Sequence, residues 1–199
     1  MKRIALLFAL IASFLAGCGG TLPPAPTNAA TPDYKYIIGP GDSLNVIVWR
    51  NPELSGTVPV RPDGRITTPL VEDMVALGKN PSQLARELEI SLKKFIQDPV
   101  VTIVVQNFGG VTSEQVRVIG QAARPAALPY RQNMSLMDVM IAVGGLTEFA
   151  SGNRAVLIRG AEGNKSYNVR LRDLMKRGDV TANIQLLPGD VIIIPESWF

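Results

Sequence analysis

The N-terminal segment limits which part of this chain can fold, because it has the order of an export signal. Met1-Lys2-Arg3 forms a basic start, an apolar run follows from Ile4 to Leu15, and the small residues Ala16 and Gly17 precede Cys18. This order is typical of a signal peptide that is removed from the mature protein. A single transmembrane helix is the alternative, but the apolar run is shorter than the roughly 20 residues that a helix needs to cross a bilayer. We therefore expect residues 1–17 to be a signal peptide.

Cys18 is the one cysteine of the chain, so an intramolecular disulfide is excluded. Leu15-Ala16-Gly17-Cys18 resembles the lipobox of bacterial lipoproteins, which implies cleavage before Cys18 and a thioether-linked lipid on it. In that family an aspartate after the cysteine favours retention in the inner membrane. Gly19 stands there instead, so the resemblance implies lipid anchoring at the periplasmic face of the outer membrane. Gly, Pro, Ala, Thr and Asn dominate the next residues, and we expect 18–33 to be the lipidated cysteine and a flexible tether.

The composition excludes several kinds of chemistry. The chain has no histidine, which excludes a Ser-His-Asp or Cys-His relay and a histidine-ligated zinc or iron centre. We expect no enzymatic activity, no cofactor and no metal. Removal of Lys2 and Arg3 with the signal peptide lowers the formal net charge from +3 to +1, so no nucleic-acid partner is expected.

The first half of the mature chain has two turn signals. Gly39-Pro40-Gly41-Asp42 suits a type II turn between expected strands at 36–38 and 44–49, because proline fixes φ and glycine accepts a positive φ. Arg61-Pro62-Asp63-Gly64-Arg65 predicts a hairpin between strands at 58–60 and 66–68.

A helix follows these turns. Asn80 is a candidate N-cap, Pro81 suits the first helical position, and Gln83 can complete a capping box. An apolar stripe predicts that the helix continues to Asp98, and a strand is expected at 100–105; the stripe comprises Leu84, Ala85, Leu88, Leu92, Phe95 and Ile96. Residues 34–110 are thus predicted to form a compact α+β unit.

The second half, residues 111–199, repeats this mixture of elements. We expect strands at 115–119, 155–159, 167–169 and 191–195, a loop at 120–129, and helices starting at Ser135 and at 171–177. Ser135 and Asp138 have the spacing of a capping box, and Gly144-Gly145 predicts the end of that helix. Pro-Gly-Asp occurs at 40–42 and again at 188–190, as an internal repeat or as a favoured turn before a strand; the tripeptide alone leaves both open.

The ordered motifs resemble the outer-membrane polysaccharide export lipoprotein family. The segments 36–44, 60–66 and 68–70 are similar to its polysaccharide biosynthesis/export domain, and the segments 116–120, 135–139, 144–147 and 188–191 are similar to the SLBB domain, a β-grasp module. Further segments at 48–55, 71–74 and 195–199 resemble the short form of the subgroup found beside exosortase/PEP-CTERM systems. The resemblance covers nearly all of the mature chain.

The resemblance implies a periplasmic homo-oligomeric ring that connects an inner-membrane polysaccharide co-polymerase to the outer membrane, with polysaccharide leaving through its lumen. Long members continue into an amphipathic helix that forms a pore. Only Glu196 to Phe199 follow Pro195 here, and four residues cannot cross a hydrocarbon core. We therefore expect no C-terminal transmembrane helix and a separate outer-membrane β-barrel as partner.

The carboxylates are the residues most easily mistaken for catalytic ones. Asp42, Asp63 and Asp190 each lie beside glycine in a turn, where aspartate ordinarily accepts bonds from nearby backbone amides. Glu72 and Asp73 are adjacent acids among apolar residues, and they are either a solvated loop or a contact with a basic residue of a neighbouring subunit.

Two other features suit contacts with partners. Arginines are numerous in the second half, and each is either part of a solvated face or a ligand for acidic groups; they are Arg117, Arg124, Arg131, Arg154, Arg159, Arg170 and Arg172. Trp198 and Phe199 either pack on the domain or contact the barrel or the membrane interface.

Two competing functions remain beside export. One is a periplasmic glycan-binding or sensing lipoprotein that forms no conduit. The other is a glycan lyase or hydrolase, which the acids alone suggest and which would need two carboxylates across a sugar ring.

Overall fold

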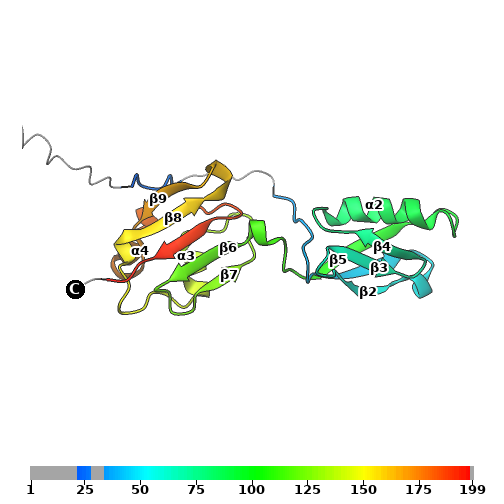
Figure 1. The fold of residues 1–199 in the computed structure, drawn as a ribbon, viewed down its shortest axis with the longest axis horizontal. Coiled ribbons are helices and arrows are strands. Elements are labelled where there is room, and N and C mark those ends of the chain that lie inside the picture. The colour runs from blue at the N-terminus through cyan, green and yellow to red at the C-terminus, as the bar shows by residue number, and fades with distance from the viewer. Residues whose placement is uncertain (1–21, 28–33, 198–199) are drawn as a thin grey trace, which may run out of the picture.

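The computed structural model describes residues 22–27 and 34–197. The described chain forms two domains, which follow one another along the longest axis of the molecule (Figure 1). Each has its own cluster of buried apolar side chains. The residues of the first cluster come from the segment 38–103, and those of the second come from the segment 116–194. Both domains combine helices with sheet, which confirms the predicted α+β class.

The first domain is built on a three-stranded antiparallel sheet of order β2-β1-β5 and a two-stranded hairpin, β3-β4. The elements are β1 (Ser43–Val48), η1 (Pro52–Leu54), β2 (Gly56–Pro59), β3 (Arg65–Thr68), β4 (Val71–Val75), α2 (Pro81–Leu92) and β5 (Val101–Asn107). The inward-facing residues of β1 are Leu44, Val46 and Val48. They share one buried cluster with the apolar face of α2.

The start of α2 is as the sequence predicts. The Asn80 side chain accepts a hydrogen bond from the Gln83 amide at 2.9 Å, and the Gln83 side chain accepts one from the Asn80 amide at 3.1 Å. The predicted extension to Asp98 is wrong, since the helix ends at Leu92. The amides of Phe95 and Ile96 both donate to the Leu92 carbonyl. This tightening rotates Phe95 off the buried stripe and leaves it 57 % exposed.

Two strand predictions for the first domain are also wrong. Residues 36–38 form no strand, because the Ile38 backbone bonds to the Gly78 and Lys79 backbone instead of a ladder. The Arg61 to Arg65 turn forms, but the strands around it do not make the predicted hairpin. Instead β2 pairs with β1, and β3 pairs with β4.

The second domain contains a five-stranded mixed sheet of order β7-β6-β10-β8-β9. Its strands are β6 (Val116–Gly120), β7 (Ala126–Leu128), β8 (Ala155–Arg159), β9 (Lys165–Val169) and β10 (Val191–Ile194). Strand β10 is parallel to β6 and antiparallel to β8. The helices are α3 (Leu136–Ala142), α4 (Leu171–Arg177) and the short η2 (Thr112–Glu114), η3 (Gly152–Arg154), η4 (Gly160–Glu162) and η5 (Val180–Ala182).

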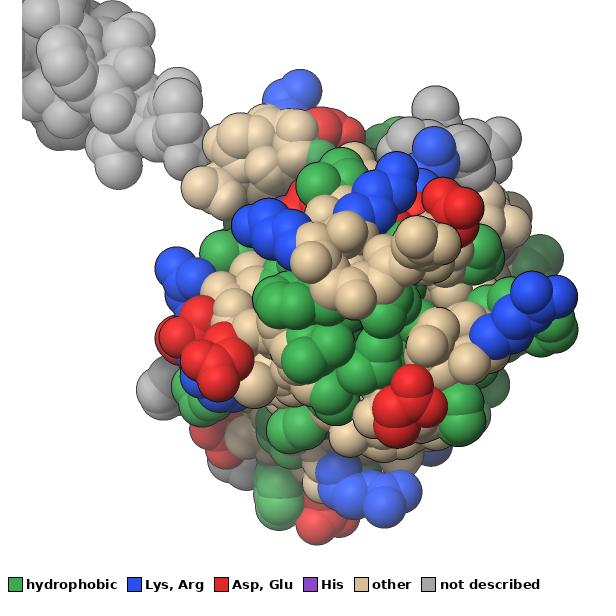
Figure 2. Space-filling view, turned by 90° about the vertical axis from the view of Figure 1, so that its right-hand side faces the viewer, with side chains coloured by type: hydrophobic (Ala, Val, Ile, Leu, Met, Phe, Trp, Pro, Cys, Tyr) green, Lys and Arg blue, Asp and Glu red, His purple; other side chains and the backbone are tan. Residues whose placement is uncertain are grey.

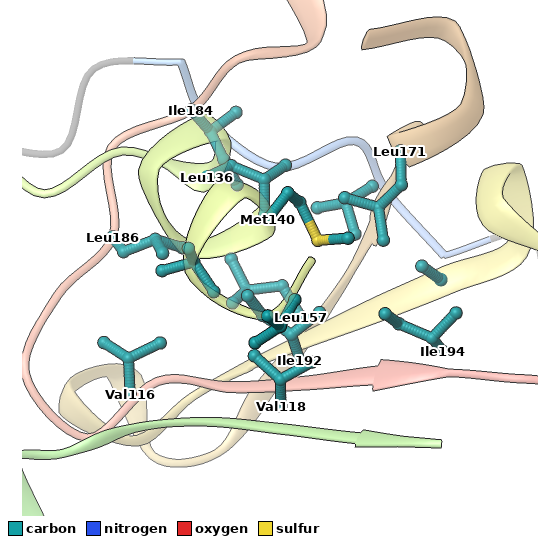
Figure 3. Close-up of a cluster of buried hydrophobic side chains, with 14 of the residues drawn as sticks. Val116, Val118, Leu136, Met140, Leu157, Leu171, Ile184, Leu186, Ile192 and Ile194 are labelled. Carbon is teal, nitrogen blue, oxygen red and sulfur yellow. The ribbon is translucent and has the colours of Figure 1, made fainter. Parts of the chain in front are cut away.

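Helix α3 packs on this sheet. Figure 3 shows Leu136 and Met140 of α3 on the same side of the strands as Leu157 and Ile192. The predicted capping box is confirmed, because Ser135 accepts from the Asp138 amide and Asp138 accepts from the Ser135 amide. The predicted span of α4 also agrees with the structure. The prediction of a loop over the whole of 120–129 is wrong, because the backbone of β7 within it pairs with β6.

Of the expected flexible tether, the structure describes residues 22–27, and the rest lies outside the described residues. Within it, Pro24 forms a parallel bridge with Asn168 of β9, and this blue segment lies along β9 in Figure 1. Across the described residues, no helix combines the length and the apolar character needed to cross a membrane.

Candidate functional site at the domain junction

Asp42 connects the first turn of the chain to the junction between the domains. Its side chain is fully buried. One carboxylate oxygen accepts hydrogen bonds from the Gly39 amide at 2.9 Å and the Tyr36 hydroxyl at 2.7 Å. The other accepts from the amides of Gly109 and Gly110 at 2.7 and 2.9 Å. The bond to Gly39 confirms the predicted local role, whereas the contacts with Gly109 and Gly110 join positions too distant in the sequence for a local pattern to predict.

Glycine is required where these two segments meet. A Cβ atom on Gly39 would lie 2.0 Å from the Gly110 carbonyl oxygen, far inside van der Waals contact. The backbone of the first turn therefore packs directly on the segment that leaves the first domain. Gly110 itself has a φ of 65°, which favours glycine at this position as well.

Aromatic side chains surround the junction. Tyr34 and Tyr130 meet edge to face with ring centroids 4.9 Å apart, and Tyr36 and Phe108 do so at 5.2 Å. The Tyr34 hydroxyl donates to Glu114 at 3.0 Å. Burial, together with the hydrogen bonds to Glu114 and Asp42, raises the pKa of Tyr34 and Tyr36 above their ordinary value. Both hydroxyls therefore stay protonated as donors throughout the neutral range.

A pocket of about 420 Å³ opens beside these rings. Its lining combines aromatic faces with amide and guanidinium groups and consists of Tyr36, Asn107, Phe108, Pro129, Tyr130 and Arg131. Aromatic surface with a few polar donors is typical of sites for small polar ligands. Arg131 is a possible ligand for acidic groups on its sequence alone, whereas Tyr36, Phe108 and Tyr130 are 72 and 22 positions apart and carry no local signal that they meet.

The second Pro-Gly-Asp turn has a different role from the first. Asp190 is fully buried and accepts from the Leu187 amide at 2.8 Å, which is the predicted local bond. Its carboxylate also lies 3.6 Å from the Arg159 guanidinium. Burial raises the pKa of Asp190 to about 6, although the Leu187 amide and Arg159 oppose that shift.

Arg159 is not part of a solvated face, since its side chain is fully buried. It donates to the Gln185 carbonyl at 3.0 Å and lies over the ring of Tyr167. Among the described residues, its Nε and the Asp190 Oδ1 have no hydrogen-bond partner. Arg159 is therefore a structural residue of the second domain.

The two acids predicted to contact a neighbouring subunit lie on β4 of the hairpin β3-β4. Glu72 and Asp73 are both exposed, and Arg61 binds Asp73 at 2.6 Å and Asp63 at 2.9 Å. Arg61 holds the pKa of Asp63 below its usual value. Asp73 thus already has a basic partner within the chain, and its contact with another subunit stays a prediction. Cys18, Trp198 and Phe199 lie outside the described residues.

The free end of the first domain also carries apolar surface. Figure 2 shows this end, with hydrophobic side chains gathered at its centre and charged ones around them. Trp49 and Val100 lie side by side where β1 ends and β5 begins, since the Trp49 amide donates to the Val100 carbonyl at 2.9 Å. Their exposed fractions are 67 % and 53 %.

Comparison with known proteins identifies both domains. Residues 30–106 match the family model described as polysaccharide biosynthesis/export protein, and residues 114–194 match that of the SLBB domain. Similar proteins include the EPS I polysaccharide export outer membrane protein EpsA of Ralstonia nicotianae, with 27 % identity over 84 % of this chain and 48 % of the relative. The exopolysaccharide production protein ExoF of Rhizobium meliloti is 29 % identical over 98 % of this chain and 45 % of the relative.

A third relative is the capsule polysaccharide export outer membrane protein CtrA of Neisseria meningitidis, with 28 % identity over 76 % of this chain and 42 % of the relative. The chain spans less than half the length of each of these three proteins. The fold, the two matched domains and their order lead to one conclusion: the chain belongs to the outer-membrane polysaccharide export family, with a polysaccharide export domain followed by an SLBB domain.

Proposed function

We propose that this protein is a non-enzymatic component of a polysaccharide export system, acting as a periplasmic connector or conduit for exopolysaccharide. The observation that carries the proposal is the ordered pair of export and SLBB domains over residues 30–106 and 114–194. Relatives with this pair are named for polysaccharide export at the outer membrane.

The junction supports a connector in particular. A ring whose subunits join two membranes needs its domains held in one relative orientation, because a flexible joint would let the lumen lose its shape. Asp42 binds the Gly109-Gly110 segment that leads out of the first domain, and Tyr34 contacts Glu114 and Tyr130 of the second. These contacts favour a fixed arrangement of the two domains.

The finer features of the proposal come from the sequence. The signal peptide and lipidation at Cys18 hold the mature protein on the periplasmic face of the outer membrane. Copies assemble into a ring that meets an inner-membrane co-polymerase and a separate outer-membrane β-barrel. Glu72 and Asp73 supply subunit contacts, and Trp198 and Phe199 supply an apolar contact with the barrel or the membrane. The protein is of the exosortase-associated subgroup.

Gene deletion tests the proposal. In the deletion strain, sugar polymer should fall outside the cell and accumulate in the periplasm, and the intact gene should restore secretion. Unchanged secretion would contradict an export role. Electron micrographs of the purified lipidated protein test the ring directly, since they show either closed rings or separate subunits.

The second candidate function is glycan binding without a conduit, and the aromatic pocket at the junction favours it. Its aromatic faces and Arg131 could accept a sugar with an acidic group. A stable monomer in mild detergent that binds oligosaccharide would support this function over the ring.

A further inference from the structure

Two further pockets adjoin the aromatic pocket at the domain junction. One, of about 550 Å³, lies at the start of α2 and shares Tyr36 with the aromatic pocket. The other, of about 340 Å³, lies beside α3 and shares Pro129 and Arg131 with it. The three pockets therefore follow one another from the export domain to the SLBB domain. We call them together the junction groove, and its course is marked by Lys35, Arg86, Tyr36, Phe108, Arg131 and Asp138.

Two cations in the junction groove are free to bind a ligand. Lys35 lines the pocket at α2, and Arg131 lines the other two. Both side chains are exposed, and within residues 22–27 and 34–197 neither makes a hydrogen bond or an ion pair. By contrast, Arg154 and Arg170 of the same domain are exposed but bound by groups of the chain itself. A ligand with carboxylate groups would supply the partners that the two free cations lack.

The other charges of the groove limit where acidic groups can bind. Arg86 is already paired with Glu89, at 2.8 Å. Asp138 accepts hydrogen bonds from the Ser135 amide and hydroxyl at 2.9 and 2.6 Å, which hold the pKa of its carboxyl below the usual value. It is therefore an anion at neutral pH and repels acidic groups from the α3 end. Carboxylates of a ligand should bind at the two free cations instead.

An exposed aromatic ring lies in the middle pocket. Phe108 is 53 % exposed, while its edge-to-face contact with Tyr36 holds the ring in place. Asn107 beside it is also exposed, and its side-chain amide offers both donors and an acceptor. A sugar ring has an apolar C–H face and hydroxyl groups around its edge. It can therefore pack on Phe108 while its hydroxyls bind Asn107.

The walls of the groove suit a saccharide better than a peptide. Only Asn107 and Leu128 of the lining residues belong to strands, and each is the last residue of its strand. An extended peptide commonly binds by pairing its backbone with a free strand edge. Among the described lining residues, no strand edge runs along the groove.

We propose that the junction groove binds a segment of an acidic polysaccharide, with Arg131 pairing with a carboxylate and Phe108 packing on a sugar ring. The inference rests on the proposed export function, since the exported polymer is the saccharide that this protein meets. It deepens that function by naming the class of polymer, one that contains carboxylate-bearing sugars. Because the groove crosses the junction, the bound segment contacts both domains.

Calorimetric titration of the purified, lipidated protein in mild detergent tests the class of ligand. The probes are hexamers of galacturonic, glucuronic and mannuronic acid and their methyl esters, which keep the sugar rings but lose the charge. At least one acid should bind, and its ester should bind about tenfold more weakly. Hexaglutamate, an acidic peptide, should bind no better than the esters. Binding of none of the acids, or binding of an ester or of hexaglutamate as tight as that of the acid, would overturn the proposal.

Substitutions locate the site. Arg131→Gln should weaken binding of the acid about tenfold, and Arg131→Lys should restore part of it because the charge is kept. Arg117→Gln is the matched control, because Arg117 is an exposed arginine of β6 that lines none of the three pockets. The unfolding midpoints should match the parent, which separates lost binding from lost structure. Equal losses from Arg131→Gln and Arg117→Gln would indicate attraction by net charge alone and would overturn the site.

Chain length tests whether the three pockets act as one groove. A dimer of the same acid should bind at Arg131 alone, whereas the hexamer should reach the pocket of Lys35 as well. We therefore expect Lys35→Gln to weaken binding of the hexamer and to leave binding of the dimer unchanged. Equal weakening of both probes, or of neither, would overturn the continuous groove.

The deletion strain separates this proposal from the export role. If deletion lowers secretion while the purified protein binds none of the acids, the groove proposal fails and the export role stands. If the protein binds an acid with the expected loss in Arg131→Gln while deletion leaves secretion unchanged, the groove stands and the export role fails.

Discussion

Asp42 and Gly110 are joined by a 2.9 Å hydrogen bond although 68 positions separate them in the sequence. The carboxylate of a turn in the first domain thereby fixes the backbone segment that leads into the second. Both carboxylate oxygens of Asp42 accept hydrogen bonds, from Tyr36, Gly39, Gly109 and Gly110. The junction thus depends on a side chain at position 42 that accepts hydrogen bonds through both of its terminal atoms.

Asp42→Asn should destabilise the protein without changing the size of the side chain. The amide group presents N–H donors where the native oxygen accepts bonds, so at least one buried amide of Gly39, Gly109 or Gly110 loses its partner. Such a loss costs about 1–3 kcal/mol. Denaturant unfolding measures it, and Asp63→Asn on the exposed turn is the control, for which we expect little change. Equal effects of the two substitutions would contradict the role of Asp42.

Gly39→Ala should disturb the junction through sterics alone. A Cβ atom at this position meets the Gly110 carbonyl oxygen, so the two segments must separate, at a cost of about 1–3 kcal/mol. Gly56→Ala is the matched control, because a Cβ there meets nothing within 4 Å. Thermal unfolding of both variants tests this, and hydrogen exchange at Gly109 and Gly110 should accelerate only in Gly39→Ala.

Asp190 should make stability fall as pH rises from about 4 to about 6. Its folded-state pKa of about 6 lies above the unfolded value of 3.8, so the folded protein holds the proton more tightly in this window. The free energy of unfolding then decreases with pH, by at most about 1.4 kcal/mol per pH unit. Asp190→Asn should remove this contribution, so that its stability relative to the parent increases between pH 4 and 6. A pH-independent difference between the two proteins would refute the raised pKa.

Cys18→Ser should release the protein from the membrane while its domains stay folded, because the substitution removes the lipid attachment and no residue of either buried cluster. Cell fractionation should move the protein from the outer-membrane fraction to the soluble periplasm, and polymer export should fall. The far-UV circular dichroism of the released domains should match the parent. Normal membrane retention and secretion would rule out the lipid anchor.

Glu72→Lys should weaken subunit assembly if the acidic hairpin contacts a basic residue of a neighbour. Glu72 is exposed on β4, so reversal of its charge should leave the unfolding midpoint unchanged and reduce the oligomer in light scattering, more so at low salt. Glu148→Lys makes the same change at an exposed site of the second domain. Loss of assembly in both variants would point to net charge rather than to this contact.

Local patterns in the sequence determined the elements whose signals lie within a few residues. The capping boxes at Asn80 and Ser135, the span of α4 and the α+β class follow from capping, periodicity and turn chemistry, which act between neighbouring residues. Strand pairing was harder to predict. The Arg61 to Arg65 turn formed, but β2 pairs with β1 and β3 pairs with β4, and this choice of partners depends on strands that lie outside the turn and its two neighbours.

Only the tertiary structure decided what the two Pro-Gly-Asp turns and the proline-rich segment do. The same tripeptide places Asp42 against the Gly109-Gly110 backbone and Asp190 beside Arg159, because burial and partners come from segments distant in the sequence. The composition of residues 22–27 predicted a free tether, since it offers little apolar surface of its own. The exposed edge of β9 supplies the missing hydrogen-bond partners, and an edge is formed only when the sheet has assembled.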